Sequence, residues 1–540
     1  MLNPKDYYIF SDKFKKIENL IGKGLIKEAK SQLSTDLNQF EKYMLTTLIH
    51  IDLGEIHQAM EVATLAINLS RQQNNIKLEV MAMLFHSFAI IHTGPYDQLS
   101  KTIETIETKM EKLENNTLSY SHSLFLTIKG TLSHFTGNEI SGINDLENAI
   151  QQWKNQGNKP QAARSLHHLG RLYQPIKALP IIEESRLIWH SMGNVLSYGK
   201  ASCFLGYNHI ALGNFNTAFE LNSKALEIGY QENNTTLIAN ASECLGNIFL
   251  SRGEYETAIT HFTRSKESWI SNGRRWPESA SRLYLGRTYL ILGDMNNAIS
   301  NLKKTLDLRS DLGMSNSWLI DPIFYLICAF IYNDQKDMAI DLKNKLEIIY
   351  LKDPKPINKI YLKLSECIIL THKTRLRDKI SAAIILDGLN LNYEEINWGI
   401  KITGFKLRCE LLLLELEVTY HDEILSELTL LIDEINMIAK KQFLPSEEIE
   451  STIFKSKLEL IRGNSKLAMD LLHSAHEIAE HYNINHLVLR INDIIKRIQE
   501  DIQKWINIDE TTPLFEKIKE LELKDYLDFT MKLKNDNTTE

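Results

Sequence analysis

The most constraining feature of this sequence is a pattern that returns every 40 residues near the middle of the chain. Three segments carry it: LGYNHIALGNFNTAF, LGNIFLSRGEYETAI and LGRTYLILGDMNNAI. In each segment a Leu-Gly pair lies seven to eight residues before a second glycine, and an alanine follows that glycine by five. The second glycines are Gly213, Gly253 and Gly293. Any fold for this chain must therefore repeat with the same period.

The residues between these marks have helical periodicity, because apolar residues recur every three or four positions. The second glycine interrupts that periodicity, and a glycine can adopt the left-handed conformation that ends a helix. A glycine inside a helix costs about 1 kcal/mol relative to alanine. The glycine of each Leu-Gly pair therefore needs a compensating role, and the close crossing of two helices supplies one. Each unit is predicted to be a helical hairpin that buries its apolar faces by stacking on its neighbours.

The motifs LGNIF…GEY..A and LGRTY…GDM..A resemble the tetratricopeptide repeat, a helix-turn-helix unit that usually has 34 residues. The 40-residue period resembles the longer variants of that family. The resemblance implies an all-α fold, a right-handed α-solenoid of about twelve stacked hairpins. It also implies that the first helix of each hairpin lines the concave surface. Strand signals are almost absent from the sequence.

The repeats divide the chain into four predicted parts. Residues 1–350 are expected to form the solenoid, with the best repeats at 160–313, and residues 351–445 to form degenerate helical repeats. Residues 446–508 are expected to hold the last hairpin and a capping helix. Residues 509–540 are expected to form one more helix and a frayed tail.

The weaker copies depart from the motif at the turn. One has Pro175 in place of the turn glycine, and another has Asn333-Asp334 there. In the last copy, Gly463 takes the turn position. The predicted capping helix is apolar on one face and charged on the other, as the end of a solenoid requires. Its apolar face consists of Leu487, Ile491, Ile494, Ile498, Ile502 and Trp505.

Composition excludes several classes of protein. With 43% hydrophobic and 24% charged residues, the chain of 540 residues is a folded protein. Its net charge of −8 provides no broad basic field for nucleic acid or an anionic membrane. The longest apolar runs have about half of the ~20 residues that span a bilayer, and the N-terminus lacks the apolar core of a secretory signal. Five cysteines stand far apart, which suits a reducing compartment. A cytoplasmic protein without membrane insertion or a nucleic-acid partner is predicted.

One stretch, HSAHEIAEHYNINH at 473–486, resembles the HExxH signature of zinc hydrolases. Here His481 follows His476 by five residues and not four, which turns it about 140° away on a helix. His473 shares a face with His476, but two ligands without a third make a poor site. Polar residues on an exposed helix face are favoured, and a zinc-dependent hydrolase is a remote alternative. The sequence also has no phosphate-binding glycine loop and no nucleophile elbow. No catalytic residue, cofactor or metal is predicted.

For the other candidate residues, a structural role is favoured over a chemical one. Cys203 and Cys244 fall on first helices and are predicted to be small buried residues rather than nucleophiles. Packing at a hairpin interface is favoured over ligand binding for His167 and His168. The segment RRWP at 274–277 connects two hairpins. It is predicted to be a solvated loop, with contact to a small anion or a partner as the alternative.

A partner is expected to bind the exposed side of the first helices. The predicted inward-facing residues of the best repeats are Arg164, His167, Arg171, Lys200, Tyr207, Asn240, Glu243, Asn247 and Arg287. This set leans basic in an acidic protein, and Arg, Asn and Tyr commonly grip extended peptides. The alternative is an ordinary solvated face, which would also carry polar residues. His167 and Arg171 stand where the family's carboxylate clamp has Lys and Asn, so binding of a chaperone tail is not predicted.

The leading functional prediction is a non-catalytic protein–protein interaction scaffold. It would bind a peptide segment or a protein partner in the concave groove of the superhelix. The alternative is a regulatory protein that responds to a ligand or peptide, in which binding alters the superhelical pitch.

Overall fold

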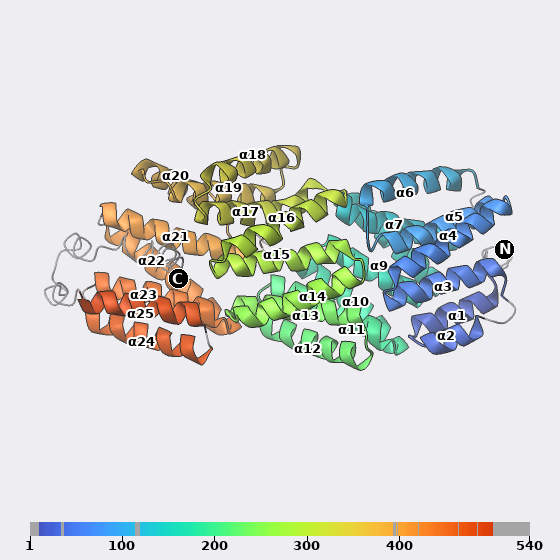
Figure 1. Ribbon diagram of the computed structural model, residues 1–540, viewed down its shortest axis with the longest axis horizontal. Coiled ribbons are helices and arrows are strands. Elements are labelled where there is room, and N and C mark those ends of the chain that lie inside the picture. The colour runs from blue at the N-terminus through green and yellow to red at the C-terminus, as the bar shows by residue number, and fades with distance from the viewer. Residues whose placement is uncertain are drawn as a thin grey trace.

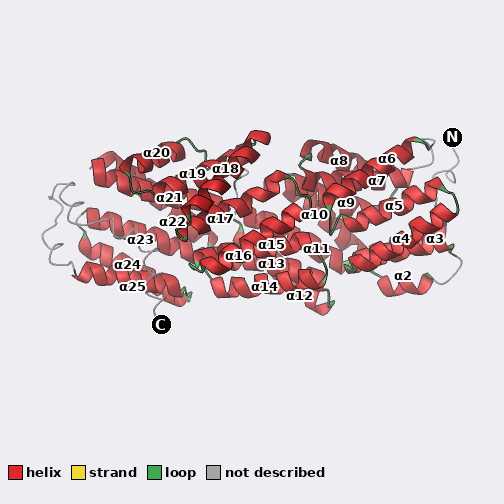
Figure 2. Ribbon diagram, turned by 45° about the horizontal axis from the view of Figure 1, so that its top comes forward, coloured by secondary structure: helices red, strands yellow, loops and turns green. Residues whose placement is uncertain are grey.

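The computed structural model is an elongated array of stacked helices, with the N-terminal hairpins at one end and the C-terminal ones at the other (Figure 1). It describes residues 10–500 except 34–36, 114–118, 393–395, 397, 420, 463 and 483. Within these residues there are helices, turns and connections but no strand, as Figure 2 shows. The predicted all-α solenoid is confirmed.

In the described part of the chain, successive helices pair into twelve hairpins, and one further helix follows them. The first helices are α1 (Asp12–Gly22), α3 (Gln39–Leu53), α5 (Ile76–Ile90), α7 (Ser119–Thr136), α9 (Lys159–Leu172), α11 (Val195–Ala211), α13 (Thr235–Arg252), α15 (Arg275–Ile291), α17 (Ile320–Tyr332), α19 (Pro356–Thr371), α21 (Trp398–Thr419) and α23 (Pro445–Ile461). The second helices are α2 (Ile26–Gln32), α4 (Ile56–Gln72), α6 (Tyr96–Glu111), α8 (Glu139–Asn155), α10 (Pro175–Met192), α12 (Phe215–Gln231), α14 (Tyr255–Ser271), α16 (Met295–Asp311), α18 (Lys336–Lys352), α20 (Leu376–Asp387), α22 (Asp422–Gln442) and α24 (Ser465–His481). The 3-10 helix η3 (Asn316–Leu319) precedes α17, and α25 (Asn485–Glu500) follows the last hairpin.

The glycine of each Leu-Gly pair lies where the two helices of a hairpin cross. A Cβ atom added to Gly246 would lie 2.6 Å from the ring of Phe262, and one added to Gly286 would lie 2.6 Å from Leu302 Cγ. At Gly206 an added Cβ would overlap the side chain of Asn222. Protein interiors have no spare volume for such atoms. The predicted close crossing at small residues is confirmed.

The glycines at the hairpin tips have the left-handed conformation that the sequence predicts. Gly213, Gly253 and Gly293 have φ values of +78°, +85° and +79°. In the copy without a turn glycine, Asp334 takes this conformation, with φ of 55°. Pro175 instead begins α10 as its first residue, where a missing N–H costs nothing.

Hairpin tips of one superhelical turn contact the next turn. Asn194 Nδ2 donates to the carbonyl of Gly22 at 3.0 Å, and Trp318 Nε1 donates to the carbonyl of His134 at 3.0 Å. These partners lie 172 and 184 residues apart in sequence. One turn therefore takes about four and a half 40-residue repeats. Because successive turns touch, part of the concave surface is enclosed and does not form an open groove.

The C-terminal end follows the predicted pattern as far as it is described. In α25 the side chains of Leu487, Ile491, Ile494 and Ile498 are buried, as a capping helix requires. Gly463, Ile502, Trp505 and the helix predicted within 509–540 lie outside the described residues. The hairpin arrangement continues through α19 to α22, and the predicted part boundaries stay predictions. In the described part of the chain, no helix is long and apolar enough to cross a membrane.

The first prediction concerns the helix crossing. Gly246→Ala is expected to destabilise the protein by about 1–3 kcal/mol, because the fully buried Phe262 must shift to admit a methyl group. Gly388→Ala is the control, since Gly388 has φ of −76° and its nearest neighbours would lie 3.5 and 3.7 Å away. Its effect should stay within about 0.5 kcal/mol. Thermal unfolding followed by circular dichroism measures both, and equal Tm values for the two variants would contradict the role of the crossing.

Candidate functional site

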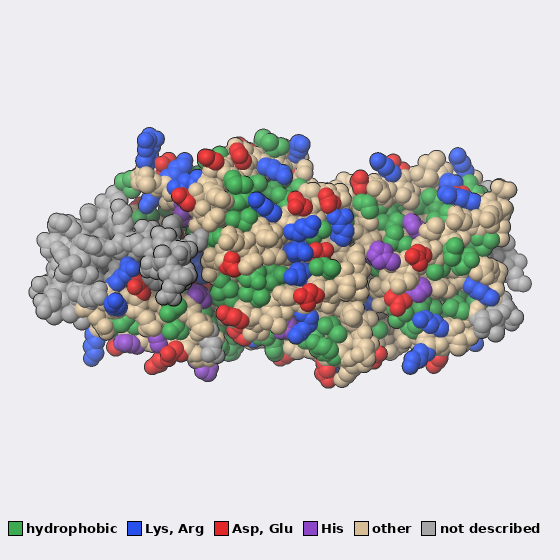
Figure 3. Space-filling model, in the orientation of Figure 1, with side chains coloured by type: hydrophobic (Ala, Val, Ile, Leu, Met, Phe, Trp, Pro, Cys, Tyr) green, Lys and Arg blue, Asp and Glu red, His purple; other side chains and the backbone are tan. Residues whose placement is uncertain are grey.

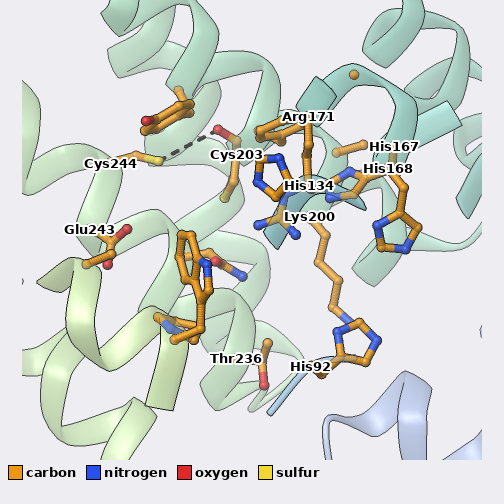
Figure 4. Close-up of a pocket in the computed structure, with 18 of the residues that line it drawn as sticks. His92, His134, His167, His168, Arg171, Lys200, Cys203, Thr236, Glu243 and Cys244 are labelled. Atoms are coloured by element: carbon orange, nitrogen blue, oxygen red, sulfur yellow. Dashed lines mark hydrogen bonds between the residues drawn. The ribbon is translucent and has the colours of Figure 1, made fainter. Parts of the chain in front are cut away.

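A cavity of about 510 Å³ lies inside the superhelix (Figure 4). One wall is built by α9, α11, α13 and α15, which are first helices of four consecutive hairpins. The facing wall comes from the preceding turn, with Asp52 near the end of α3, His92 after α5 and His134 in α7. Trp318 of η3 and Asp321 of α17 also contribute to the lining. The volume is within the range of about 300–1,000 Å³ that is typical of ligand pockets.

The Leu-Gly register decides which side chains reach the cavity. Leu and Gly face the second helix of their own hairpin, so residues elsewhere around the helix face inward. Three positions line the cavity in all four helices, namely six, three and two residues before the glycine. The position six residues before the glycine holds Arg164, Lys200, Asn240 and Ala280. The position three residues before it holds His167, Cys203, Glu243 and Leu283. The position two residues before it holds His168, Phe204, Cys244 and Tyr284.

Seven of the nine residues predicted to bind a partner line this one cavity. They are Arg164, His167, Arg171, Lys200, Tyr207, Asn240 and Glu243. Asn247 and Arg287 are not part of the lining. Asn247 is buried, and its amide donates to the carbonyl of Glu243 at 3.1 Å. The Arg287 guanidinium lies 4.9 Å from the centre of the Tyr325 ring in α17, so it packs between first helices.

Several lining residues were not predicted to bind. Arg274 is the N-cap residue of α15 and Trp276 lies in its first turn, so the solvated loop predicted for RRWP is wrong. His168 also lines the cavity, although the sequence favours packing. Asp52 and His134 come from another superhelical turn, and no local sequence signal could bring them to this site.

Arg171 is the most unusual side chain of the cavity. Its guanidinium carbon lies 5.7 Å from the ring centres of both Phe204 and Trp276. In the described part of the chain it makes no ion pair, whereas Arg164 pairs with Asp52. Burial lowers the pKa of Arg171, but the group stays charged at neutral pH. Arg171 is therefore a cation that packs against aromatic rings. Among the described residues, no carboxylate accepts a hydrogen bond from its N–H groups.

Two further cations connect the superhelical turns. Arg274 donates to Nδ1 of His92 at 3.3 Å, and Lys200 Nζ donates to the carbonyl of Asp52 at 3.1 Å. Burial, followed by repulsion from Arg171, lowers the pKa of Arg274 to about 10. Burial lowers the pKa of Lys200 to about 8, against the opposing effect of Asp52. Both groups are charged at pH 7.

The histidines of the cavity are neutral hydrogen-bonding groups. Burial lowers the pKa of His168 to about 3 and holds the pKa values of His92, His134 and His167 well below the ordinary value. Figure 4 shows the four rings around Arg171 and Lys200, with Glu243 on the other side of the view. Among the described residues, the charged lining comprises five cations and three carboxylates: Arg164, Arg171, Lys200, Arg274 and Arg309 against Asp52, Glu243 and Asp321. The cavity is therefore positive inside an acidic protein.

Some buried donors of the cavity wall have no partner. Nε of Arg274 and the indole Nε1 atoms of Trp269 and Trp276 make no hydrogen bond to any residue that the structure describes. Buried polar atoms are paired in the great majority of cases. Three such donors at one cavity indicate a surface suited to acceptors.

Glu243 is partly protonated at neutral pH. Burial raises the pKa of Glu243 to about 7, although Ser281 Oγ donates to its carboxyl at 2.6 Å. Cys203 and Cys244 lie nearby, and the Cys244 thiol donates to the carbonyl of Cys203 at 3.7 Å. Burial raises the pKa of both thiols, so neither is a thiolate at pH 7. Their prediction as buried residues is confirmed.

The HExxH-like segment lies in α24, apart from this cavity. His473 and His481 are exposed, and His476 Nδ1 lies 3.6 Å from a carboxylate oxygen of Glu480. Among residues 10–500, as far as they are described, no three His, Cys, Asp or Glu side chains are arranged to hold a metal ion.

Residues 237–311, which span most of α13 and reach the end of α16, match the tetratricopeptide repeat family. This segment of the chain contains tetratricopeptide repeats. This match confirms the resemblance carried by LGNIF…GEY..A and LGRTY…GDM..A. No curated protein matches the sequence.

The array of stacked hairpins is similar to several solved structures at low sequence identity. A Rap protein complexed with competence and sporulation factor is 12% identical with a TM-score of 0.42, covering 79% of this chain and 99% of that chain. Cut9–Hcn1 of the APC/C is 12% identical with a TM-score of 0.39, covering 86% and 89%. Yeast Tom70 is 15% identical with a TM-score of 0.35, covering 91% and 96%. These values are too low to carry a ligand or partner over to this chain.

The second prediction concerns Glu243. Because its pKa is raised to about 7, the folded state holds this proton more tightly than the unfolded state, and stability falls as pH rises from about 4.5 through 7. Glu243→Gln removes that loss and should stabilise the protein by up to about 3 kcal/mol at pH 8, with little effect near pH 4.5. The Tm at both pH values measures this.

The exposed Glu220 of α12 provides the control. Glu220→Gln should change Tm by similar small amounts at both pH values. If Glu243→Gln shows no larger gain at pH 8 than at pH 4.5, the assigned protonation of Glu243 is wrong.

Proposed function

We propose that this protein is a non-catalytic binding protein that holds a short segment of a protein partner in its central cavity. The observation that carries the proposal is the convergence of four consecutive first helices on one cavity. Seven side chains that the repeat register predicts to face a partner meet there. The fold and the family match support the general class of the protein, an array of stacked helical hairpins that contains tetratricopeptide repeats.

The size of the cavity favours a short segment over a folded domain. A volume of about 510 Å³ accommodates a ligand of small-molecule or short-peptide size. The lining also suits a peptide, because the amide of Asn240 and the neutral rings of His167 and His168 can each donate and accept hydrogen bonds. Four of the seven tryptophans of the chain line the cavity, namely Trp189, Trp269, Trp276 and Trp318. Large aromatic side chains of this kind commonly dominate binding energy.

The charge distribution supports a protein or peptide partner and not nucleic acid. On the face drawn in Figure 3, Lys and Arg side chains are interspersed with Asp and Glu. The net charge of −8 adds no general attraction for phosphate backbones. The five free, buried cysteines support a reducing compartment, and we place the protein in the cytoplasm.

The third prediction tests the cavity as the binding site. The full-length protein is immobilised and exposed to lysate of the cells that make it, and retained proteins are quantified by mass spectrometry. Arg171→Glu reverses the charge at the cavity wall and should reduce capture of a stoichiometric partner at least about tenfold. Circular dichroism and Tm establish that the variant is folded.

Two variants serve as controls for that experiment. Arg275→Glu changes an exposed arginine that pairs with Asp311 at 2.7 Å, and it should retain the partner. Asn247→Ala should also retain it, because Asn247 does not line the cavity. Equal capture by Arg171→Glu and the wild type would rule out the cavity as the site.

A second candidate function, a ligand-responsive regulator, is favoured by the position of the cavity between two superhelical turns. Contacts across the cavity wall join the turns, from Arg164 to Asp52 and from Arg274 to His92. A segment bound between them contacts both turns and can alter their spacing. Small-angle scattering with the captured partner segment distinguishes the functions, since a regulator changes its radius of gyration on binding and a rigid scaffold does not.

A further inference from the structure

We infer that the bound segment carries an oxyanion, and that Arg171 and Arg274 bind it inside the cavity. This inference rests on the proposed function and adds the chemical class of the ligand. Among the described residues that line the cavity, cations outnumber carboxylates.

Other charged groups in the cavity already have partners. Arg164 forms an ion pair with Asp52, and Lys200 donates to the backbone carbonyl of Asp52. Arg309 donates to the carbonyl of Trp318 at 2.6 Å and to Ser279. No carboxylate among the described residues forms an ion pair with Arg171 or Arg274. Among the described residues, the Arg171 side chain has neither an ion pair nor a hydrogen bond, and the Arg274 side chain hydrogen-bonds only to the neutral ring of His92 and leaves its Nε without a partner.

Placing Arg171 and Arg274 in one enclosed cavity is unfavourable for the folded protein, because the two cations repel each other. Charges taken from water lose several kcal/mol of solvation each unless an opposite charge replaces it. An apolar side chain at either position would avoid that loss without disturbing the hairpin, because neither residue contributes to the Leu-Gly crossing. A role in binding an anion accounts for both arginines.

The donors around the two arginines match an oxyanion. Arg171 lies over the rings of Phe204 and Trp276, which leaves the edge of its planar fork for a ligand. Nε of Arg274 and the indole Nε1 of Trp276 are buried donors without partners. Arginine forks bind carboxylate and phosphate groups through paired hydrogen bonds. The Arg171 guanidinium and these unpaired donors all belong to the lining of one cavity.

Three parts of a peptide can supply the oxyanion: an acidic side chain, a free C-terminal carboxylate or a phosphorylated side chain. Four hexapeptide pools separate these sources. The pools share degenerate neutral positions and differ in one group, which is a glutamate, a free C-terminus, a phosphoserine or, in the fourth pool, none of these. All N-termini are acetylated, and all C-termini except those of the second pool are amidated.

The full-length protein is incubated with each pool, separated by gel filtration, and the co-eluting peptides are quantified by mass spectrometry. At least one oxyanion pool should be retained tenfold or more above the neutral pool. For the most enriched peptide, Arg171→Gln and Arg274→Gln should each raise the Kd about 10- to 100-fold, as expected for loss of charge-assisted hydrogen bonds. Arg275→Gln is the matched control, since Arg275 is adjacent to Arg274 but is exposed and paired with Asp311. Its Kd should stay within about twofold of the wild type.

The outcomes separate this inference from the proposed function. Equal retention of the neutral and oxyanion pools, with no effect of either arginine variant, overturns the inference and leaves peptide binding standing. Retention of no pool overturns both. If a variant does not fold, the comparison of the four pools on the wild-type protein still decides the matter.

Discussion

The close approach of backbones at residues without a side chain governs this structure at two levels. Within a hairpin, Gly206, Gly246 and Gly286 let the two helices cross where any Cβ atom would meet a buried neighbour. Between superhelical turns, hairpin tips abut the next turn. A Cβ atom on Gly253 would lie 2.9 Å from Ser446, and one on Gly54 would lie 2.6 Å from the hydroxyl of Thr236. The same residue type thus controls both the stacking of hairpins and the spacing of the turns.

Contact between turns is what converts a concave surface into a cavity. An open groove would keep its arginines and histidines hydrated, with ordinary pKa values. Enclosure removes much of that water, so His168 stays neutral and the pKa of Glu243 moves to about 7. It also places Arg171 on aromatic rings and not in solvent. The electrostatic character of the site is therefore a consequence of the winding of the superhelix.

The same enclosure links the two candidate functions. A segment held only by α9 to α15 would be bound by a static scaffold. Here the facing wall belongs to the preceding turn, through Asp52, His92 and His134. Within a turn, each hairpin stacks on its neighbours along the chain, so small adjustments at each of these interfaces add up to a change in pitch. Under the proposed function, a segment that contacts both turns would act on that pitch, so a scaffold and a regulator would differ in the extent of movement and share the same site.

The sequence by itself determined the hairpins, their number and the inward-facing register of the first helices. Helical periodicity and the Leu-Gly pair are local signals, and they brought seven of nine predicted residues to one cavity. Only the tertiary structure decided that Asn247 packs within its own helix, that Arg287 meets Tyr325, and that Arg274 faces the cavity. It also decided which residues form the opposite wall. The physical reason is that pitch is the sum of small rotations at many interfaces, so contacts between residues 112 to 184 positions apart leave no periodic trace in the sequence.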